Sequence, residues 1–230
     1  MFSSFPLRHP HNDKLRLFYE ETYCGYSVMQ HEKGPLIENF LERSLYTLNL
    51  AQEENRTTFT FRVDLRFPDA MPRLRMHDDN AVLARFFRFF FYELRKADTK
   101  YAPSPRYLWA REQADSDKPH YHLMFLLNKD AYDSLGIFSP DKNGTYSRQN
   151  LYHRMMRSWL KAMGFAADDP RFRQLVNVSD SPVTKVPWSS ILHLDDWCAM
   201  DEAMYIASYL CKAYSKPVNQ GIHVFDSSRR

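Results

Sequence analysis

One short run, TTFTFRVDLRFP at residues 57–68, constrains the fold more than any other part of the chain. Its apolar and polar side chains alternate without interruption until Pro68. Because successive side chains of a β-strand point to opposite faces, the pattern predicts a strand with one face in the core and one in water. The expected core face carries Phe59, Phe61, Val63, Leu65 and Phe67, and the expected wet face carries Thr58, Thr60, Arg62, Asp64 and Arg66.

Helical and strand patterns alternate along the rest of the chain. Apolar spacings of three and four, with suitable end residues, predict helices at 35–50, 78–97, 148–164 and 201–216. Short apolar runs predict strands at 106–112, 120–128 and 172–179. The turn-forming residues 113–119 should join the first two of these strands as a hairpin.

Between residues 58 and 179 the predicted order is β-α-β-β-α-β. This is the order of the ferredoxin-like split βαβ arrangement, an RRM-like antiparallel sheet backed by helices, so the expected class is α+β. The expected organisation is an N-terminal arm and helix at 1–56, a main domain at 57–218 and a C-terminal tail at 219–230.

Composition, cysteine spacing and the absence of long apolar stretches indicate what kind of protein carries such a domain. The 230 residues, 44% of them hydrophobic, suffice for a packed core. Three widely spaced cysteines, Cys24, Cys198 and Cys211, argue against a disulfide framework. The N-terminus lacks the apolar segment of a signal peptide, and no stretch suits a membrane span, so a cytoplasmic protein is expected. A net charge of +3 is compatible with nucleic acid binding without requiring it.

Two histidines open the predicted strand in KPHYHLMFLLN, residues 118–128. His120 and His122 are two positions apart, so on a strand both point to one face and can converge on one metal ion. A second such pair, His9 and His11 around Pro10, shows that the bare spacing also arises by chance. The flanking apolar run favours metal ligation at 120 and 122 over two histidines buried without a ligand.

Glu112, which ends the preceding strand, is the predicted third ligand. Folding back across the hairpin turn brings it next to His120 in the neighbouring strand, because paired strands lie about 4.8 Å apart. The alternative for Glu112 is a solvated glutamate at a hairpin end. Nitrogen and oxygen ligands with open coordination positions suit Mn²⁺ or Mg²⁺, and Zn²⁺ is possible.

A second informative stretch is YIASYLCKAYSK at residues 205–216. On a helix its two tyrosines and two lysines would form one stripe at i, i+4, i+7 and i+11. An ordinary amphipathic helix, with the tyrosines wedged against the sheet, is the alternative. The lysines favour a chemical role, since a positive charge stabilises a phenolate and the phosphate that it attacks. The stripe consists of Tyr205, Tyr209, Lys212 and Lys216.

The two motifs together resemble those of the HUH endonucleases, the superfamily of rolling-circle replication initiators, relaxases and related transposases. The His-hydrophobic-His metal motif of that superfamily falls on residues 120–122, its upstream acidic ligand on Glu112, and its Tyr-x-x-x-Tyr-x-x-Lys motif on Tyr205, Tyr209 and Lys212. The chain is most similar to replication proteins of filamentous phages and their prophage relatives, the inovirus type. Tyr209 is the expected main nucleophile, because Ser208 stands where Tyr205 would need a lysine.

The resemblance implies an HUH fold, nicking and joining of single-stranded DNA at a replication origin through a 5′-phosphotyrosine, and host helicase and polymerase as partners. A non-catalytic single-stranded nucleic-acid-binding prophage regulator on the same fold is the alternative. Asp64 could assist the metal or pair with a neighbouring arginine, and the pair is favoured. Candidate DNA-binding residues, each of which could instead be a solvated surface cation, are Arg62, Arg66, Arg154, Arg157, Lys161 and Lys216.

Overall fold

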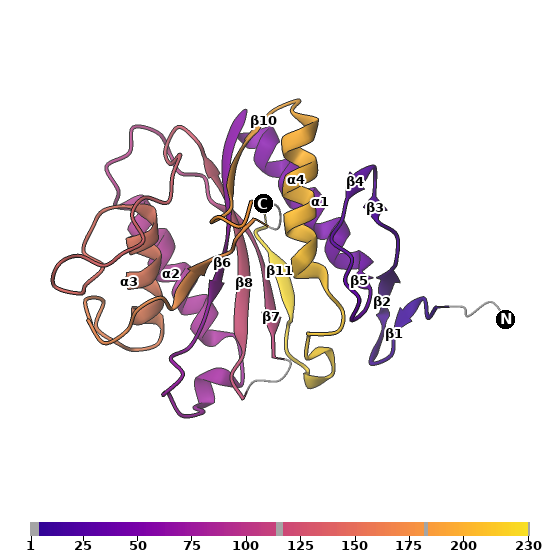
Figure 1. Cartoon of the computed structure of the whole chain (residues 1–230), viewed down its shortest axis with the longest axis horizontal. Helices are drawn as coiled ribbons and strands as arrows, with labels where there is room; N and C mark the ends of the chain where they lie inside the picture. The colour runs from indigo at the N-terminus through magenta and orange to yellow at the C-terminus, as the bar shows by residue number, and fades with distance from the viewer. Residues whose placement is uncertain (1–4, 114–116, 182–183, 230) are drawn as a thin grey trace.

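A computed structural model describes residues 5–113, 117–181 and 184–229 of the chain. Within them, a six-stranded antiparallel sheet lies between two pairs of helices (Figure 1). Its three long strands are β6 (Thr57–Leu65), β7 (Arg106–Glu112) and β8 (His120–Asn128). The fold is α+β, as the sequence predicts. The strand order of the sheet is β10-β6-β8-β7-β11, and β9 also pairs with β6. Residues 114–116 of the predicted hairpin turn lie outside the described residues.

Three short strands complete the sheet at its edges. β9 (Val176–Val178) and β10 (Ser189–His193) both pair with the outer edge of β6, at opposite ends of that strand. β11 (Phe225–Ser227) pairs with β7 on the other side. The expected C-terminal tail therefore contributes β11 to the main sheet, and β9 is shorter than the predicted strand at 172–179.

One face of the sheet packs against α2 (Ala81–Arg95) and α3 (Leu151–Ala162). The apolar positions of the alternating run lie in this core, together with a group of phenylalanines on α2. Ring contacts converge on Phe125 of β8, which lies 5.5 Å from Phe61 and 5.1 Å from Phe90 between ring centroids. This face is the predicted core.

The other face was predicted to lie in water, and that prediction is wrong for every residue of the set except Arg66, which is exposed. It is covered by α1 (Glu38–Glu54) and α4 (Trp197–Ser208), which Figure 1 shows on the opposite side of the sheet from α2 and α3. Thr58 and Thr60 are fully buried, and Arg62 and Asp64 are only 9% and 5% exposed. The covering helices lie outside the β-α-β-β-α-β segment, so the local pattern of β6 carries no sign of them.

The N-terminal arm, for which the sequence predicted no strands, contains several short ones. β1 (Arg8–His9), β2 (Asn12–Phe18) and β5 (Leu36–Ile37) form a small sheet beside α1, and β3 (Thr22–Tyr23) pairs with β4 (Tyr26–Ser27). Figure 1 shows these strands on the far side of α1 from the main sheet. Short 3₁₀ turns occur at η1 (Arg75–His77) and η3 (Val218–Gln220).

The last predicted helix, 201–216, ends earlier than its pattern indicates. α4 begins at Trp197 and stops at Ser208, followed by the 3₁₀ turn η2 (Tyr209–Cys211) and an extended Lys212 with ψ of 135°. Contacts with the arm explain the change: Lys212 forms a β-bridge with Leu36, and the Ala213 amide donates to the Pro35 carbonyl. No helix within the described ranges has both the length and the apolar character needed to cross a bilayer.

Candidate metal centre

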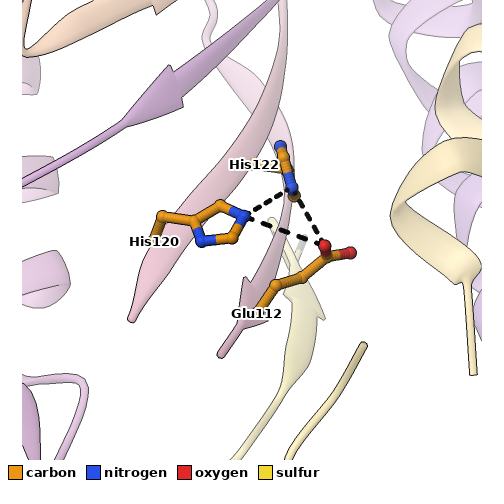
Figure 2. A group of neighbouring side chains, drawn as sticks. All are labelled: Glu112, His120 and His122. Carbon is orange, nitrogen blue, oxygen red and sulfur yellow. Dashed lines mark hydrogen bonds and ion pairs between the residues drawn. The ribbon is translucent and has the colours of Figure 1, made fainter. Parts of the chain in front are cut away.

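Three side chains that could hold a metal ion meet where β7 and β8 lie side by side. Strand pairing sets Glu112 directly opposite His120, as the hairpin predicts, and His122 lies two positions further on the same face. Figure 2 shows the two imidazoles and the carboxylate converging. His122 Nε2 lies 3.2 Å from His120 Nε2 and 3.2 Å from Glu112 Oε2, and His120 Nε2 lies 3.8 Å from the same oxygen.

These separations suit ligands of a single cation. Two donor atoms that each lie about 2.1 Å from one ion can be at most about 4.2 Å apart, and all three separations are shorter than that. His122 and Glu112 are buried at 3% exposed each, whereas the His120 side chain is 30% exposed. The donors fit a divalent cation that keeps one side open to a substrate, and they leave its identity among Mn²⁺, Mg²⁺ and Zn²⁺ undecided.

The orientation of His122 is fixed by Asp64 on the neighbouring strand. Asp64 lies opposite His122 in the β6–β8 register, and its Oδ1 is 2.5 Å from His122 Nδ1. Ser179 also donates to that oxygen. An imidazole held through Nδ1 presents Nε2 to a metal, which is the usual arrangement around ligating histidines. The sequence favoured an ion pair of Asp64 with a neighbouring arginine, and the structure has such a contact with Arg66, but only at 3.9 Å.

Two buried lysines surround Glu112. Lys212 Nζ lies 3.1 Å from Glu112 Oε2, and Lys216 Nζ lies 3.4 Å from Oε1. Burial alone would raise the pKa of Glu112, but the hydrogen bond to His122 and the two lysine charges hold that pKa well below its usual range. Burial lowers the pKa of Lys216 to about 8 against the opposing effect of Glu112. With its side chain fully buried, Lys216 neutralises Glu112 and does not present a charge at the surface for DNA.

Tyr209 lies against His122, one of the three ligands. Its ring packs edge to face on His122, with 5.1 Å between centroids, and two cations flank it. The Arg62 guanidinium is 4.2 Å from the ring centroid and the Lys212 ammonium 3.4 Å. Burial, followed by the charge of Glu112, raises the pKa of the Tyr209 phenol above its ordinary value, and Arg62 opposes this only in part. The helical stripe is broken at Lys212, yet the chain that follows η2 still brings Lys212 to Tyr209.

Arg62 is a buried cation that the described residues leave incompletely paired. Its Nε is buried and has no hydrogen-bond partner among them. Burial lowers the pKa of Arg62, and the charge of Asp64 opposes this effect. A buried arginine without a full set of acceptors is costly to the fold, and an anionic group entering the site would supply them.

The other predicted site residues lie at different places. Tyr205 is half-buried on α4, one turn before Tyr209, beside the apolar cluster under α1 and α4. Arg66 has a 59% exposed side chain and lines a pocket of about 270 Å³ with Lys118 and His120. The cations of α3 lie on the opposite face of the sheet, where all of them pair with Glu93 of α2: Arg154, Arg157 and Lys161. The structure does not bring these three to the metal centre.

The fold and this centre together define an α+β protein with a candidate two-histidine, one-glutamate metal site. The chain belongs to the family of the YagK/YfjJ C-terminal domain, whose model matches residues 18–228. It is similar to YagK of Escherichia coli K12, at 37% identity over 62 residues that cover 27% of this chain and 26% of YagK. It is also similar to YfjJ of the same organism, at 26% identity over 152 residues that cover 60% of this chain and 70% of YfjJ. The chain thus spans about a quarter of the length of YagK, and no solved structure matches it.

Proposed function

We propose that this protein is a metal-dependent tyrosine endonuclease and strand transferase of the HUH type, acting on single-stranded DNA. The order β6-α2-β7-β8-α3-β9 supports a ferredoxin-like split βαβ core, with β9-β6-β8-β7 as neighbouring strands. The metal ligands lie on β7 and β8 of that core, and the tyrosine follows α4, the helix that covers the same face.

The position of Tyr209 carries the proposal. A phenol in contact with one metal ligand, and flanked by an ammonium and a guanidinium, is arranged to become a nucleophile toward a phosphate. Both cations stabilise negative charge, first on the phenolate and then on the phosphate oxygens.

The proposed reaction is a transesterification at one phosphodiester. The Tyr209 oxygen bonds to phosphorus while the bond to the 3′-oxygen breaks; the phenol loses a proton and the 3′-oxygen gains one. The products are a 5′-phosphotyrosine and a free 3′-hydroxyl. The covalent link preserves a phosphodiester bond, so the later joining step needs no nucleotide cofactor. A divalent cation held by His120, His122 and Glu112 would supply Lewis-acid polarisation of the scissile phosphate.

Other residues have supporting roles in this proposal. Asp64 holds His122 in its ligating orientation, Lys216 balances the buried Glu112, and Arg62 and Arg66 bind phosphate oxygens. Tyr205, one turn from Tyr209, is a candidate for the second strand transfer. In the setting that the resemblance implies, the 3′-hydroxyl primes rolling-circle copying of a replicon in the cytoplasm by a host helicase and polymerase.

Covalent trapping tests this function. The purified chain is incubated with short single-stranded oligonucleotides of varied sequence and Mn²⁺, and the products are separated on a denaturing gel. We expect a protein–DNA adduct with the wild type that is absent when a chelator is added. The adduct should also be absent with His120→Ala and with Tyr209→Phe, whereas the control His11→Ala should form it. DNA binding without any adduct across metals and sequences would instead support the non-catalytic regulator.

A further inference from the structure

A pocket of about 570 Å³ lies beside the edge strand β9, apart from the metal ligands. The segment before α3 forms one wall, and β9 and the residues on either side of it form the other. Residues that line it and matter for its chemistry are Phe138, Tyr146, Tyr152, Arg173, Asn177 and Asp180. Neither the metal site nor Tyr209 uses any of these residues.

The pocket adjoins the proposed active site through the sheet. Asn177 of β9 lies directly opposite Asp64 of β6, and Asp64 contacts His122 of β8. Since Val176 and Val178 point into the core under α2 and α3, Asn177 between them points to the face that carries Asp64. Two strand spacings separate β9 from β8, or about 10 Å, a distance that a short extended segment of single-stranded DNA can bridge.

Aromatic rings supply the flat surfaces of the pocket. Tyr146 and Tyr152 are almost fully buried, and Phe138, which is 36% exposed, packs on Tyr152 at 4.9 Å between centroids. The hydroxyl of Tyr152 donates to the Val176 carbonyl, and that of Tyr146 accepts from the Gln174 amide. Because the two tyrosines are almost fully buried and their hydroxyls are engaged within the protein, Phe138 offers the accessible ring surface of the pocket, with Tyr152 behind it. Exposed rings of this kind stack on unpaired bases.

The polar groups of the pocket suit a neutral ligand with hydrogen-bonding edges. Arg173 and Asp180 contribute opposite charges, so the lining has no excess of cations that would select a phosphate. Asn177 is exposed and offers an amide, which can donate to and accept from a base edge. Flat ring surfaces beside an amide and a balanced charge pair match a nucleobase better than they match an anion.

We infer that this pocket binds one unpaired nucleobase of the DNA strand, next to the phosphate positioned at the metal centre. The inference rests on the proposed function for its ligand. Phe138 is the stacking surface, and Asn177 reads the edge of the base. A base in a duplex has its edge and both faces occupied, so the pocket selects single-stranded DNA.

Photo-crosslinking and binding measurements test the inference on the full chain. An oligodeoxythymidylate that contains 4-thiothymine is irradiated with the protein, and the modified peptides are mapped by mass spectrometry. We expect crosslinks in the segment 138–152 or at 173–180. In parallel, fluorescence anisotropy compares oligodeoxythymidylate with an abasic strand of the same length. Phe138→Ala should weaken binding of the first by about 10-fold and leave that of the second unchanged.

Ile137→Ala is the matched control, because Ile137 is the exposed neighbour of Phe138 and does not line the pocket. It should bind both strands as the wild type does. Crosslinks confined to other segments, or equal affinities of wild type and Phe138→Ala for oligodeoxythymidylate, would overturn the inference. Neither outcome depends on adduct formation. The pocket can therefore fail while Tyr209 still forms an adduct, and it can hold while no adduct is found.

Discussion

The two faces of the central sheet are each covered by a pair of helices, yet they are built from different side chains. The face under α2 and α3 is a continuous aromatic and aliphatic core. The face under α1 and α4 is apolar at one end and carries buried ionisable groups at the other: Arg62, Asp64, Glu112, His122, Lys212 and Lys216. Burying charges costs free energy unless they are paired, and a replacement by apolar residues would often be no less stable. The face under α2 and α3 therefore contributes mainly to stability, whereas the face under α1 and α4 combines an apolar cluster with the groups of the candidate metal centre.

Removal of a ring from the apolar face should give the largest change in stability. Phe125 contacts the rings of Phe61, Phe86 and Phe90, so Phe125→Ala leaves a cavity in the centre of the core. We expect a loss of about 3–5 kcal/mol in the free energy of unfolding, measured by urea denaturation. An effect below about 1 kcal/mol would show that the two faces do not divide stability and chemistry in this way.

On the ionisable face, loss of a ligand should act on metal binding. His122→Ala removes a central donor, and Mn²⁺ affinity measured by calorimetry should fall by about 100-fold or more. His11→Ala provides the control, because His11 is the exposed histidine of the His-Pro-His segment, and this variant should bind Mn²⁺ like the wild type. Equal Mn²⁺ affinities of His122→Ala and His11→Ala would show that His122 is not a metal ligand.

Asp64→Asn should have a smaller effect of the same kind. The amide cannot hold His122 Nδ1 as the carboxylate does, and loss of such a partner typically weakens metal binding about 10- to 100-fold. Arg66→Ala removes only the 3.9 Å contact and should leave the affinity near that of the wild type. If Arg66→Ala lowered Mn²⁺ affinity as much as Asp64→Asn, the ion pair of Asp64 with Arg66 would be the important interaction.

The smallest effect concerns the cations of the two faces in DNA binding. Arg66 lies beside His120, whereas Lys161 lies on the opposite face near Glu93. Arg66→Ala should lose one phosphate contact, so the slope of log affinity for single-stranded DNA against log salt concentration should become shallower by about 0.7. Lys161→Ala should leave this slope unchanged. Anisotropy titrations across a series of salt concentrations measure both slopes. The reverse result would place the DNA on the α3 side.

Local patterns predicted the parts of the site that depend on neighbours in the sequence. The hairpin sets Glu112 against His120, because a short turn fixes the register of its two strands. The alternation in β6 correctly separated the side chains that face α2 and α3 from those on the opposite face of the strand. The burial of the side chains on that opposite face could not be predicted from the alternation. The helices that cover them, α1 and α4, come before and after the β-α-β-β-α-β segment in the sequence.

Longer-range contacts determined the parts that the sequence did not predict. The helical pattern of 201–216 is interrupted where Leu36 and Pro35 bind the chain at Lys212 and Ala213. The contact of Asp64 with His122 requires the pairing of β6 with β8, two strands that α2 and β7 separate in the sequence. The sequence left open that Asp64 assists the metal but favoured an arginine as its partner, and local alternation could not identify His122.

Mapping the covalent adduct tests the central claim, that Tyr209 is the nucleophile of the ionisable face. After reaction with single-stranded DNA and Mn²⁺, the protein is digested with protease and nuclease, and the modified peptide is sequenced by mass spectrometry. We expect the nucleotide on Tyr209, with Tyr205→Phe still forming the adduct. A nucleotide on Tyr205 in the wild-type protein, or on neither tyrosine, would contradict the account.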